Sequence, residues 1–276
     1  MRLRKRTLIA KFFADRGTHL AAMIAYFALL SFVPLLLLSL ALLGLAGQAD
    51  EGSFFVTELN RILPGASLDN ILRAVRSIQR NATAIGIIGA VTVLWTSLSL
   101  FSVLESAFNI VYGRPNRSFL RGKAVASLLL VGSLVTLFAS LVIGSIGVRV
   151  LDRYAPGFIG NRYVAYGFSV FVSLAGVFAF LLSVYYVLTN ESLTFHDVLP
   201  GATAAAIVLE ATFQILPIYV SVSKNVPVLQ AIGGPIYLLV WLYVMSNVIV
   251  FGAEVNWWFA QRRATAALRD EALGLA

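Results

Sequence analysis

The chain has 276 residues, of which 59% are hydrophobic and only 12% are charged. Soluble domains carry about 25% charged residues, so this composition excludes an ordinary soluble enzyme and a disordered chain. Cysteine is absent, which excludes disulfides and cysteine nucleophiles. The net charge of +8 comes from basic residues that flank apolar runs, a pattern typical of membrane topology rather than of nucleic-acid binding.

Six apolar stretches are long enough to cross a bilayer as helices, which takes about 20 residues each. They cover residues 19–47, 82–108, 124–148, 164–189, 200–222 and 232–259. The first stretch is longer than the apolar region of a signal peptide, so we expect it to be retained. No linker rich in Gly or Ser divides the chain. We therefore expect an all-α integral membrane protein with one polytopic domain over residues 1–276.

The Lys and Arg residues of alternate segments predict the orientation. Thirteen of them fall on the side of the N-terminus and eight on the other side, so we expect both termini in the cytoplasm. Residues 3–16 mix basic and apolar side chains and predict an interfacial helix, with a helical extension of the first span as the alternative. Residues 53–63 and 68–79 predict two short amphipathic helices in the first outer loop.

Three carboxylates fall inside the predicted spans, where an ionised group needs a partner or water. They are Glu105, Glu210 and Glu254, and no Lys or Arg lies in the core of any span. Glu210 is the deepest, and it shares a helical stripe with Thr203 and Gln214. This stripe is either the polar wall of a path through the bundle or structural glue between helices.

Two further polar stripes have helical spacing. One consists of Trp95, Ser99, Ser102, Ser106 and Asn109, and the other of Tyr243, Asn247, Glu254 and Trp258. Each stripe either lines a cavity or packs against a neighbouring helix. If a path exists, we expect its lining to include Glu105, Asn109, Thr203, Glu210, Gln214, Asn247 and Glu254.

The sequence lacks the motifs of several common chemistries. It has no phosphate-binding G-x-x-x-x-G-K-[ST] loop and no G-x-S-x-G nucleophile motif. The only histidines, His19 and His196, are far apart and have no cysteine partners, so no zinc spacing is present. We therefore expect no metal, no cofactor and no enzyme activity.

Several short segments follow one another in a recognisable order. They are Ala25-Tyr26 with Leu30-Ser31-Phe32-Val33-Pro34, Trp95 with Leu104, Glu105, Ala107 and Asn109, Leu199-Pro200-Gly201-Ala202, and Trp241-Leu242-Tyr243 with Gly252-Ala253-Glu254-Val255-Asn256. Over about residues 8–260, this series resembles the YihY/BrkB family of bacterial inner-membrane proteins. The structural motif that the resemblance implies consists of Tyr26, Ser31, Pro34, Pro200, Gly201, Trp241 and Gly252.

The resemblance implies a six-helix, multi-pass protein of the bacterial inner membrane, with cytoplasmic termini and an envelope-related role. Some members of the family were labelled as a tRNA-processing ribonuclease, a label regarded as mistaken. Residues 225–235 depart from the tyrosine-containing, glycine-rich stretch that relatives tend to have there. No role of that loop is therefore carried over to this chain.

We expect a non-enzymatic protein that transports or accommodates a lipid or another amphipathic envelope molecule through a polar-lined helical bundle. Two alternatives stay open. One is a proton-coupled small-solute transporter that uses Glu210, and the other is a non-transporting structural or assembly factor of the envelope. The expected partners are membrane lipids, with a second copy of the chain or another envelope protein left open and nucleic acid not expected.

Overall fold

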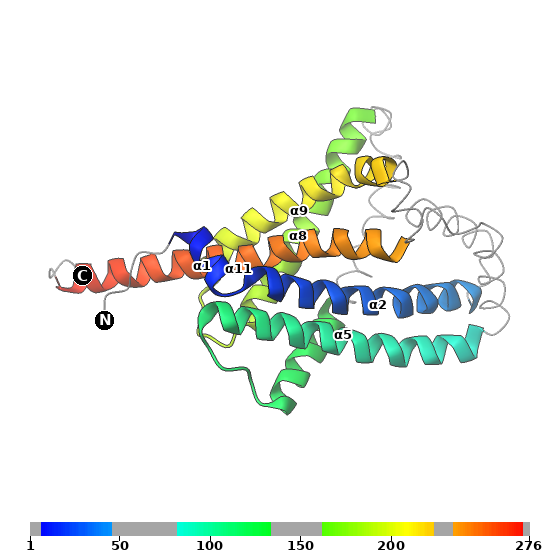
Figure 1. Ribbon diagram of the computed structural model, residues 1–276, viewed down its shortest axis with the longest axis horizontal. Coiled ribbons are helices and arrows are strands. Elements are labelled where there is room, and N and C mark those ends of the chain that lie inside the picture. Colours follow the sequence, from blue (N-terminus) through cyan, green and yellow to red (C-terminus); the bar gives the residue numbers. More distant parts are fainter. Residues whose placement is uncertain (1–6, 46–81, 134–161, 224–233, 273–276) are drawn as a thin grey trace, which may run out of the picture. The chain divides into compact units, whose positions relative to one another are not determined.

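The computed structural model describes residues 7–45, 82–133, 162–223 and 234–272. All regular secondary structure in these residues is helical, as the composition predicts. The helices labelled in Figure 1 are α1 Leu8–Ala14, α2 Gly17–Leu45, α5 Ala82–Tyr112, α8 Arg162–Leu188, α9 Phe195–Ser223 and α11 Gly234–Ala272. A further described helix covers residues 119–133.

Four of the described helices are long and apolar enough to cross a membrane. The stretches are Leu94–Tyr112, Tyr166–Leu188, Phe195–Ile215 and Leu238–Ala266, and a shorter apolar stretch covers Gly17–Phe32. Only 12% of the α8 stretch is buried, and its exposed side chains are mostly large and apolar. Surface of this kind is stable in lipid rather than in water. The chain is therefore a membrane protein.

The count of six spans stays a prediction. The predicted span over residues 124–148 is described only as far as residue 133, where it is helical. The two amphipathic helices expected over residues 53–63 and 68–79 lie outside the described residues. The cytoplasmic placement of the termini likewise stays a prediction.

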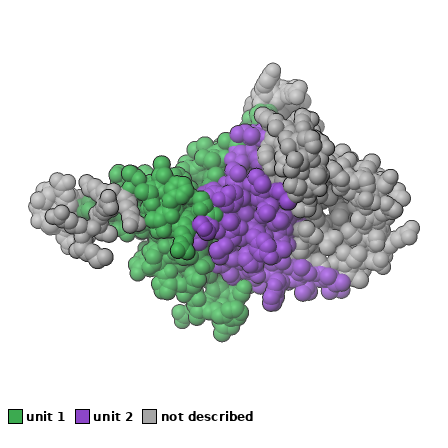
Figure 2. Space-filling view, viewed as in Figure 1, with its two compact units in different colours: residues 1–18, 104–211, 248–276 green, residues 19–103, 212–247 purple. Residues whose placement is uncertain are grey.

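The chain packs as two compact units, which Figure 2 shows in different colours. Unit 1 comprises residues 1–18, 104–211 and 248–276, and unit 2 comprises residues 19–103 and 212–247. Helices α2, α5, α9 and α11 each contribute residues to both units. Most of the polar contacts described below lie within unit 1.

Local sequence signals set where α5 ends and α9 begins. Gly113 has a φ of 65°, its N–H bonds to the Ile110 carbonyl, and the next N–H bonds to the Asn109 carbonyl. This is a Schellman ending, and it lets α5 run four residues past its predicted end at residue 108. At the start of α9, the Thr194 hydroxyl and N–H both donate to Asp197 Oδ2, at 2.6 and 2.9 Å. Side-chain capping therefore starts α9 five residues before the predicted start at residue 200.

α1 is a separate helix and not an extension of the first span. The Thr7 hydroxyl caps its beginning, and Arg16, with a φ of 57°, turns the chain before α2 begins. Phe12 of α1 is buried, and its ring lies 5.8 Å from that of Phe251. α1 therefore lies against α11 in Figure 1. Its predicted position at the bilayer interface stays a prediction.

α9 and α11 cross at two glycines. A Cβ at Gly201 would overlap the carbonyl oxygen of Gly252, and a Cβ at Gly252 would overlap the hydroxyl of Tyr185. That hydroxyl donates to the Ile249 carbonyl at 2.7 Å, and Asn256 Oδ1 accepts from the Gly201 N–H at 2.6 Å. Close backbone approach with hydrogen bonds between helices is a main source of helix association in membranes. This crossing therefore joins α8, α9 and α11 within unit 1.

Replacing Gly201 with Ala tests this crossing. The added methyl would press on a backbone oxygen that cannot move independently, so we expect a loss of about 1–3 kcal/mol in stability. The measurement is the thermal unfolding midpoint of the purified protein in detergent. The matched control is Gly176→Ala on α8, where an added Cβ meets nothing within 4 Å. Equal midpoints for Gly201→Ala and Gly176→Ala would contradict the tight crossing.

Candidate functional site

Buried polar side chains gather at one end of unit 1. This end consists of α1, the end of α5 with the loop after it, the end of α8 with the loop that leads into α9, and the part of α11 around Glu254. Three of the expected path residues lie here, namely Glu105, Asn109 and Glu254, and all three are buried. Their partners decide what they can do.

Arg117 fastens the loop after α5 to the end of α8. Its guanidinium donates to the carbonyl oxygens of Val187, Leu188 and Thr189 at 2.5–3.1 Å. The last carbonyls of a helix lack partners within it and carry the negative end of its dipole. Buried Glu105 accepts from the Arg117 N–H at 3.2 Å and lies 3.4 Å from the guanidinium. One cation therefore neutralises a carboxylate and caps α8.

Asn109 ties two loops together beside this ion pair. Its Oδ1 accepts from the Asn190 N–H at 2.7 Å, and its Nδ2 donates to Asn116 Oδ1 at 3.1 Å. Asn116 in turn donates to Ser106 Oγ at 3.1 Å, and the Asn190 side chain donates to the Pro115 carbonyl at 2.9 Å. Both polar atoms of the Asn109 amide thus hold protein groups.

Lys11 of α1 is the second buried cation at this end. Its Nζ donates to Glu254 Oε2 and to the Val111 carbonyl, both at 2.8 Å, and also pairs with Asp15. It lies 4.1 Å from the centre of the Trp257 ring, within range of a cation–π interaction. Glu254 is 0% exposed. All three ammonium donors of Lys11 are used, whereas Glu254 Oε1 is buried and has no hydrogen-bond partner among the described residues. This buried ion pair holds α1 against α5 and α11.

Both cations come from outside the predicted spans. The sequence shows no Lys or Arg in the span cores, which left Glu105 and Glu254 without an evident partner. The folded chain supplies Arg117 from a loop and Lys11 from α1. Sequence reasoning used Arg117 only to predict orientation, and Lys11 to predict orientation and the interfacial helix over residues 3–16. The sequence feature that could have indicated a partner for Glu105 was Arg117, a basic residue in the short loop that directly follows the span carrying Glu105.

Glu210 lies about 20 Å along α9 from Asp197, by the helical rise. It sits at the edge of the buried face of α9 and is 6% exposed. Its Oε2 accepts from Ser173 Oγ of α8 at 2.7 Å, and Ser173 is itself exposed. Thr203 was expected on the same stripe as Glu210. Thr203 is exposed whereas Glu210 is buried, so the two residues of the stripe lie in different surroundings.

The remaining expected path residues belong to unit 2. Gln214 is exposed on α9, and Asn247 donates to the Tyr243 carbonyl of its own helix at 2.7 Å. In α5, the hydroxyls of Ser99 and Ser102 donate to carbonyls four residues earlier, at 2.9 and 2.7 Å. These three bonds stay within one helix each.

The residues of the implied structural motif are dispersed over both units. Gly201 and Gly252 form the crossing of α9 and α11, and half-buried Pro200 precedes it. In unit 2, Trp241 is buried, Tyr26 is exposed with its ring edge-on to Phe27, and Ser31 Oγ donates to the Phe27 carbonyl at 2.9 Å. α2 continues through Pro34.

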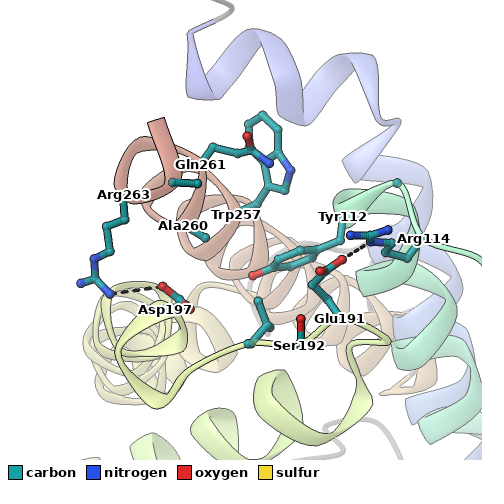
Figure 3. Close-up of a pocket in the computed structure, with 12 residues that line it drawn as sticks. Tyr112, Arg114, Glu191, Ser192, Asp197, Trp257, Ala260, Gln261 and Arg263 are labelled. Atoms are coloured by element: carbon teal, nitrogen blue, oxygen red, sulfur yellow. Dashed lines mark hydrogen bonds and ion pairs between the residues drawn. The ribbon is translucent and has the colours of Figure 1, made fainter. Parts of the chain in front are cut away.

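A pocket of about 370 Å³ opens at the polar end of unit 1. Its lining consists of Tyr112, Gly113, Arg114, Glu191, Ser192, Leu193, Asp197, Trp257, Ala260, Gln261, Arg263 and Ala264. Figure 3 shows two ion pairs on opposite sides, Arg114 with Glu191 and Arg263 with Asp197, and Tyr112 between them. The Tyr112 hydroxyl is buried and has no hydrogen-bond partner among the described residues. No group of three metal-ligating side chains occurs in the described parts of the chain.

Comparison with known proteins identifies the family. The family model described as Virulence factor BrkB matches residues 8–273. The protein belongs to this family. The resemblance read from the sequence motifs is thereby confirmed, and the BrkB segments 199–202 and 252–256 are the ones that meet at the glycine crossing.

Relatives of this BrkB-family chain carry two kinds of name. The ribonuclease-like protein YfkH of Bacillus subtilis (strain 168) is 26% identical over 90% of this chain and 92% of its own length. UPF0761 membrane proteins of Azotobacter vinelandii and of Psychrobacter sp. are 31% and 24% identical, each over 91% of this chain. The chain spans only 61% and 47% of these two relatives. No solved structure matches the chain.

Replacing Arg117 with Met tests the role of the buried guanidinium. The change would leave the Glu105 carboxylate and three carbonyls at the end of α8 without the guanidinium donor, so we expect a loss of about 3 kcal/mol in stability. The control is Arg121→Met, since Arg121 is exposed and its side chain forms no hydrogen bond or ion pair with the described residues. Thermal unfolding of both variants in detergent provides the measurement. A midpoint for Arg117→Met that equals that of Arg121→Met would show that the ion pair contributes little.

A double-mutant cycle tests the pair of Lys11 and Glu254. Lys11→Met alone strands a buried carboxylate, whereas Lys11→Met with Glu254→Met replaces the pair with apolar groups. We expect the double variant to be more stable than the Lys11→Met variant, with a coupling of more than about 1 kcal/mol. Unfolding midpoints and denaturant titrations supply the four stabilities. Additive effects would mean that the two side chains do not stabilise each other.

Proposed function

We propose that this protein accommodates and moves an amphipathic lipid of the bacterial envelope within the inner membrane. Glu210 and Ser173 provide the polar site at membrane depth. The observation that carries the proposal is the difference in exposure between the two residues. The Glu210 carboxylate is nearly buried, and it accepts a hydrogen bond from Ser173, which is exposed on α8. Polar groups next to lipid cost free energy unless they face a polar partner or ligand.

The surroundings of this pair suit an amphipathic ligand. Phe171 and Val172 next to Ser173 on α8 are exposed, as are Ile207 and Val208 close to Glu210 on α9. An acyl chain gains by packing on such side chains, while a hydroxyl, amide or phosphate of the same molecule can bond to Ser173. The arrangement therefore supports a lipid better than a small hydrated solute.

Glu105, Asn109 and Glu254 have a different role in this proposal. They were expected at the cytoplasmic mouth of a path, yet their side chains bond to Arg117, Asn190 and Lys11. We assign these residues to fixing α1 and the loops, at the end that the charge distribution predicts to face the cytoplasm. The proposed path then depends on Glu210 rather than on a continuous row of acids.

One observation favours a second candidate, a structural or assembly factor of the envelope. The ion pair of Lys11 and Glu254 is sealed, with Glu254 0% exposed, and such a pair holds elements rigidly together. A scaffold requires this rigidity, whereas a protein that opens during transport must keep it away from its moving parts. The two candidate functions differ in the role of Glu210, which lipid movement requires and a scaffold does not.

Replacing Glu210 with Leu tests the proposal. The change removes the carboxylate but keeps an apolar side chain of similar size, so lipid movement should slow by roughly 10-fold, the effect of one lost charge-assisted hydrogen bond. The assay follows fluorescent phospholipids between the leaflets of proteoliposomes that contain the purified protein. Ser173→Ala should slow movement less. Ser183→Ala is the matched control, because that hydroxyl also lies on α8 and, among the described residues, bonds only to the Ala179 carbonyl.

Two outcomes would contradict lipid movement through this site. One is a wild-type rate for Glu210→Leu. The other is a wild-type protein that moves lipid no faster than protein-free vesicles. In the second case, recovery of a stoichiometric protein partner by affinity purification from membranes would support the assembly factor.

A further inference from the structure

We infer that the pocket in Figure 3 binds the phosphoethanolamine headgroup of a phospholipid. The lipid source rests on the proposed function, but the recognition of a phosphate ester rests on the pocket's own residues. Neither Arg114 nor Arg263 is needed for the proposed site at Glu210, which lies farther along α9.

Two arginines offer unused donors to the pocket. Arg114 bonds to Glu191 through Nε, and Arg263 bonds to Asp197 through one terminal nitrogen. Their other N–H groups have no hydrogen-bond partner among the described residues. Both arginine side chains are about half exposed, whereas the two carboxylates are less than a quarter exposed. Both guanidinium groups are therefore accessible at the pocket that they line, and such planar forks bind phosphate oxygens with paired hydrogen bonds.

Tyr112 supplies an independent observation. Its hydroxyl is buried, lacks a hydrogen-bond partner among the described residues and lies between the two ion pairs. A buried hydroxyl without a partner is costly, and such groups in native proteins are normally bonded to protein, water or ligand. A phosphate oxygen held by Arg114 or Arg263 would accept from it.

The charge of the lining selects the class of headgroup. Arg114 and Arg263 are balanced by Glu191 and Asp197, so these four groups have no net charge. A ligand with one negative and one positive group matches both signs, since its phosphodiester meets the guanidinium groups and its ammonium meets a carboxylate. A phosphate dianion would also meet the two guanidinium groups, but it would leave the site with an uncompensated double negative charge beside two carboxylates. The balance therefore favours phosphoethanolamine.

The size and place of the pocket agree with this ligand. A volume of about 370 Å³ is near the lower end for small-molecule pockets, enough for a headgroup but not for a whole lipid. The lining comes from the end of the α5 stretch, the loop after α8, the beginning of the α9 stretch and the last part of the α11 stretch. The ends of membrane-spanning helices lie at the level of the headgroups.

The test measures binding to the full-length protein in dodecyl maltoside by isothermal titration calorimetry. The probes are dihexanoyl phosphatidylethanolamine, glycerophosphoethanolamine and inorganic phosphate. We expect the short-chain lipid to bind, and Arg114→Gln and Arg263→Gln each to weaken binding by about 10-fold through a lost charge-assisted hydrogen bond. Tyr112→Phe removes a single hydroxyl and should weaken binding less. Arg262→Gln is the matched control, because Arg262 stacks on Trp258 at 3.4 Å and does not line the pocket.

The outcomes separate the sources of the ligand. Binding that depends on the two arginines and is equally tight for the lipid and for glycerophosphoethanolamine would support the site and assign it to the soluble ester. Tightest binding of inorganic phosphate, or binding that Arg114→Gln, Arg263→Gln and Tyr112→Phe all leave unchanged, would overturn the inference. Tyr112→Phe keeps the test decisive if an arginine variant fails to fold.

The same measurements distinguish this inference from the proposed function. If Glu210→Leu moves lipid at the wild-type rate while headgroup binding still depends on Arg114 and Arg263, the path is wrong and the pocket stands. If lipid movement depends on Glu210 while the lipid does not bind to the pocket, the pocket is wrong and the path stands.

Discussion

The polar end of unit 1 depends on two buried cations that arrive from outside the apolar stretches. Lys11 pairs with Glu254 and holds a short N-terminal helix in place, and Arg117 pairs with Glu105 while capping α8. Without them, two carboxylates and a helix end would lie in a low-dielectric region without compensation, which costs several kcal/mol per charge. The positions of α1 and of the loop after α5 follow from this requirement.

The same contacts separate a closely packed part of the unit from the part that carries the two proposed binding sites. Close packing at Gly201 and Gly252 and the hydrogen bonds of Asn109 and Asn256 leave little freedom at the polar end. The pocket at this end has half-exposed arginines, and farther along α9 the carboxylate of Glu210 lies behind an exposed serine. Fixed elements can hold a polar site in a defined geometry, which loops alone do less well.

Local patterns predicted much of the helical structure, and some of its limits. Long apolar runs identify α5, α8, α9 and α11 because lipid requires each backbone segment to satisfy its own hydrogen bonds. The predicted beginning at Pro200 was late because Thr194 and Asp197 cap the helix earlier, and the predicted end at residue 108 was early because Gly113 provides the turn. α11 continues to Ala272, well beyond the predicted span. These helices extend beyond the apolar runs from which they were predicted, because capping residues and polar turns of helix lie outside those runs.

The sequence by itself determined the class of protein, the family and the identity of the three acids within spans, since each follows from composition, run length or ordered motifs. Only the tertiary structure decided which acids are neutralised. Lys11 and Glu254 are 243 positions apart, and no local pattern can pair residues at that separation. The environment of Glu210 likewise depends on Ser173 of another helix, because burial is a property of packed neighbours and not of helical periodicity.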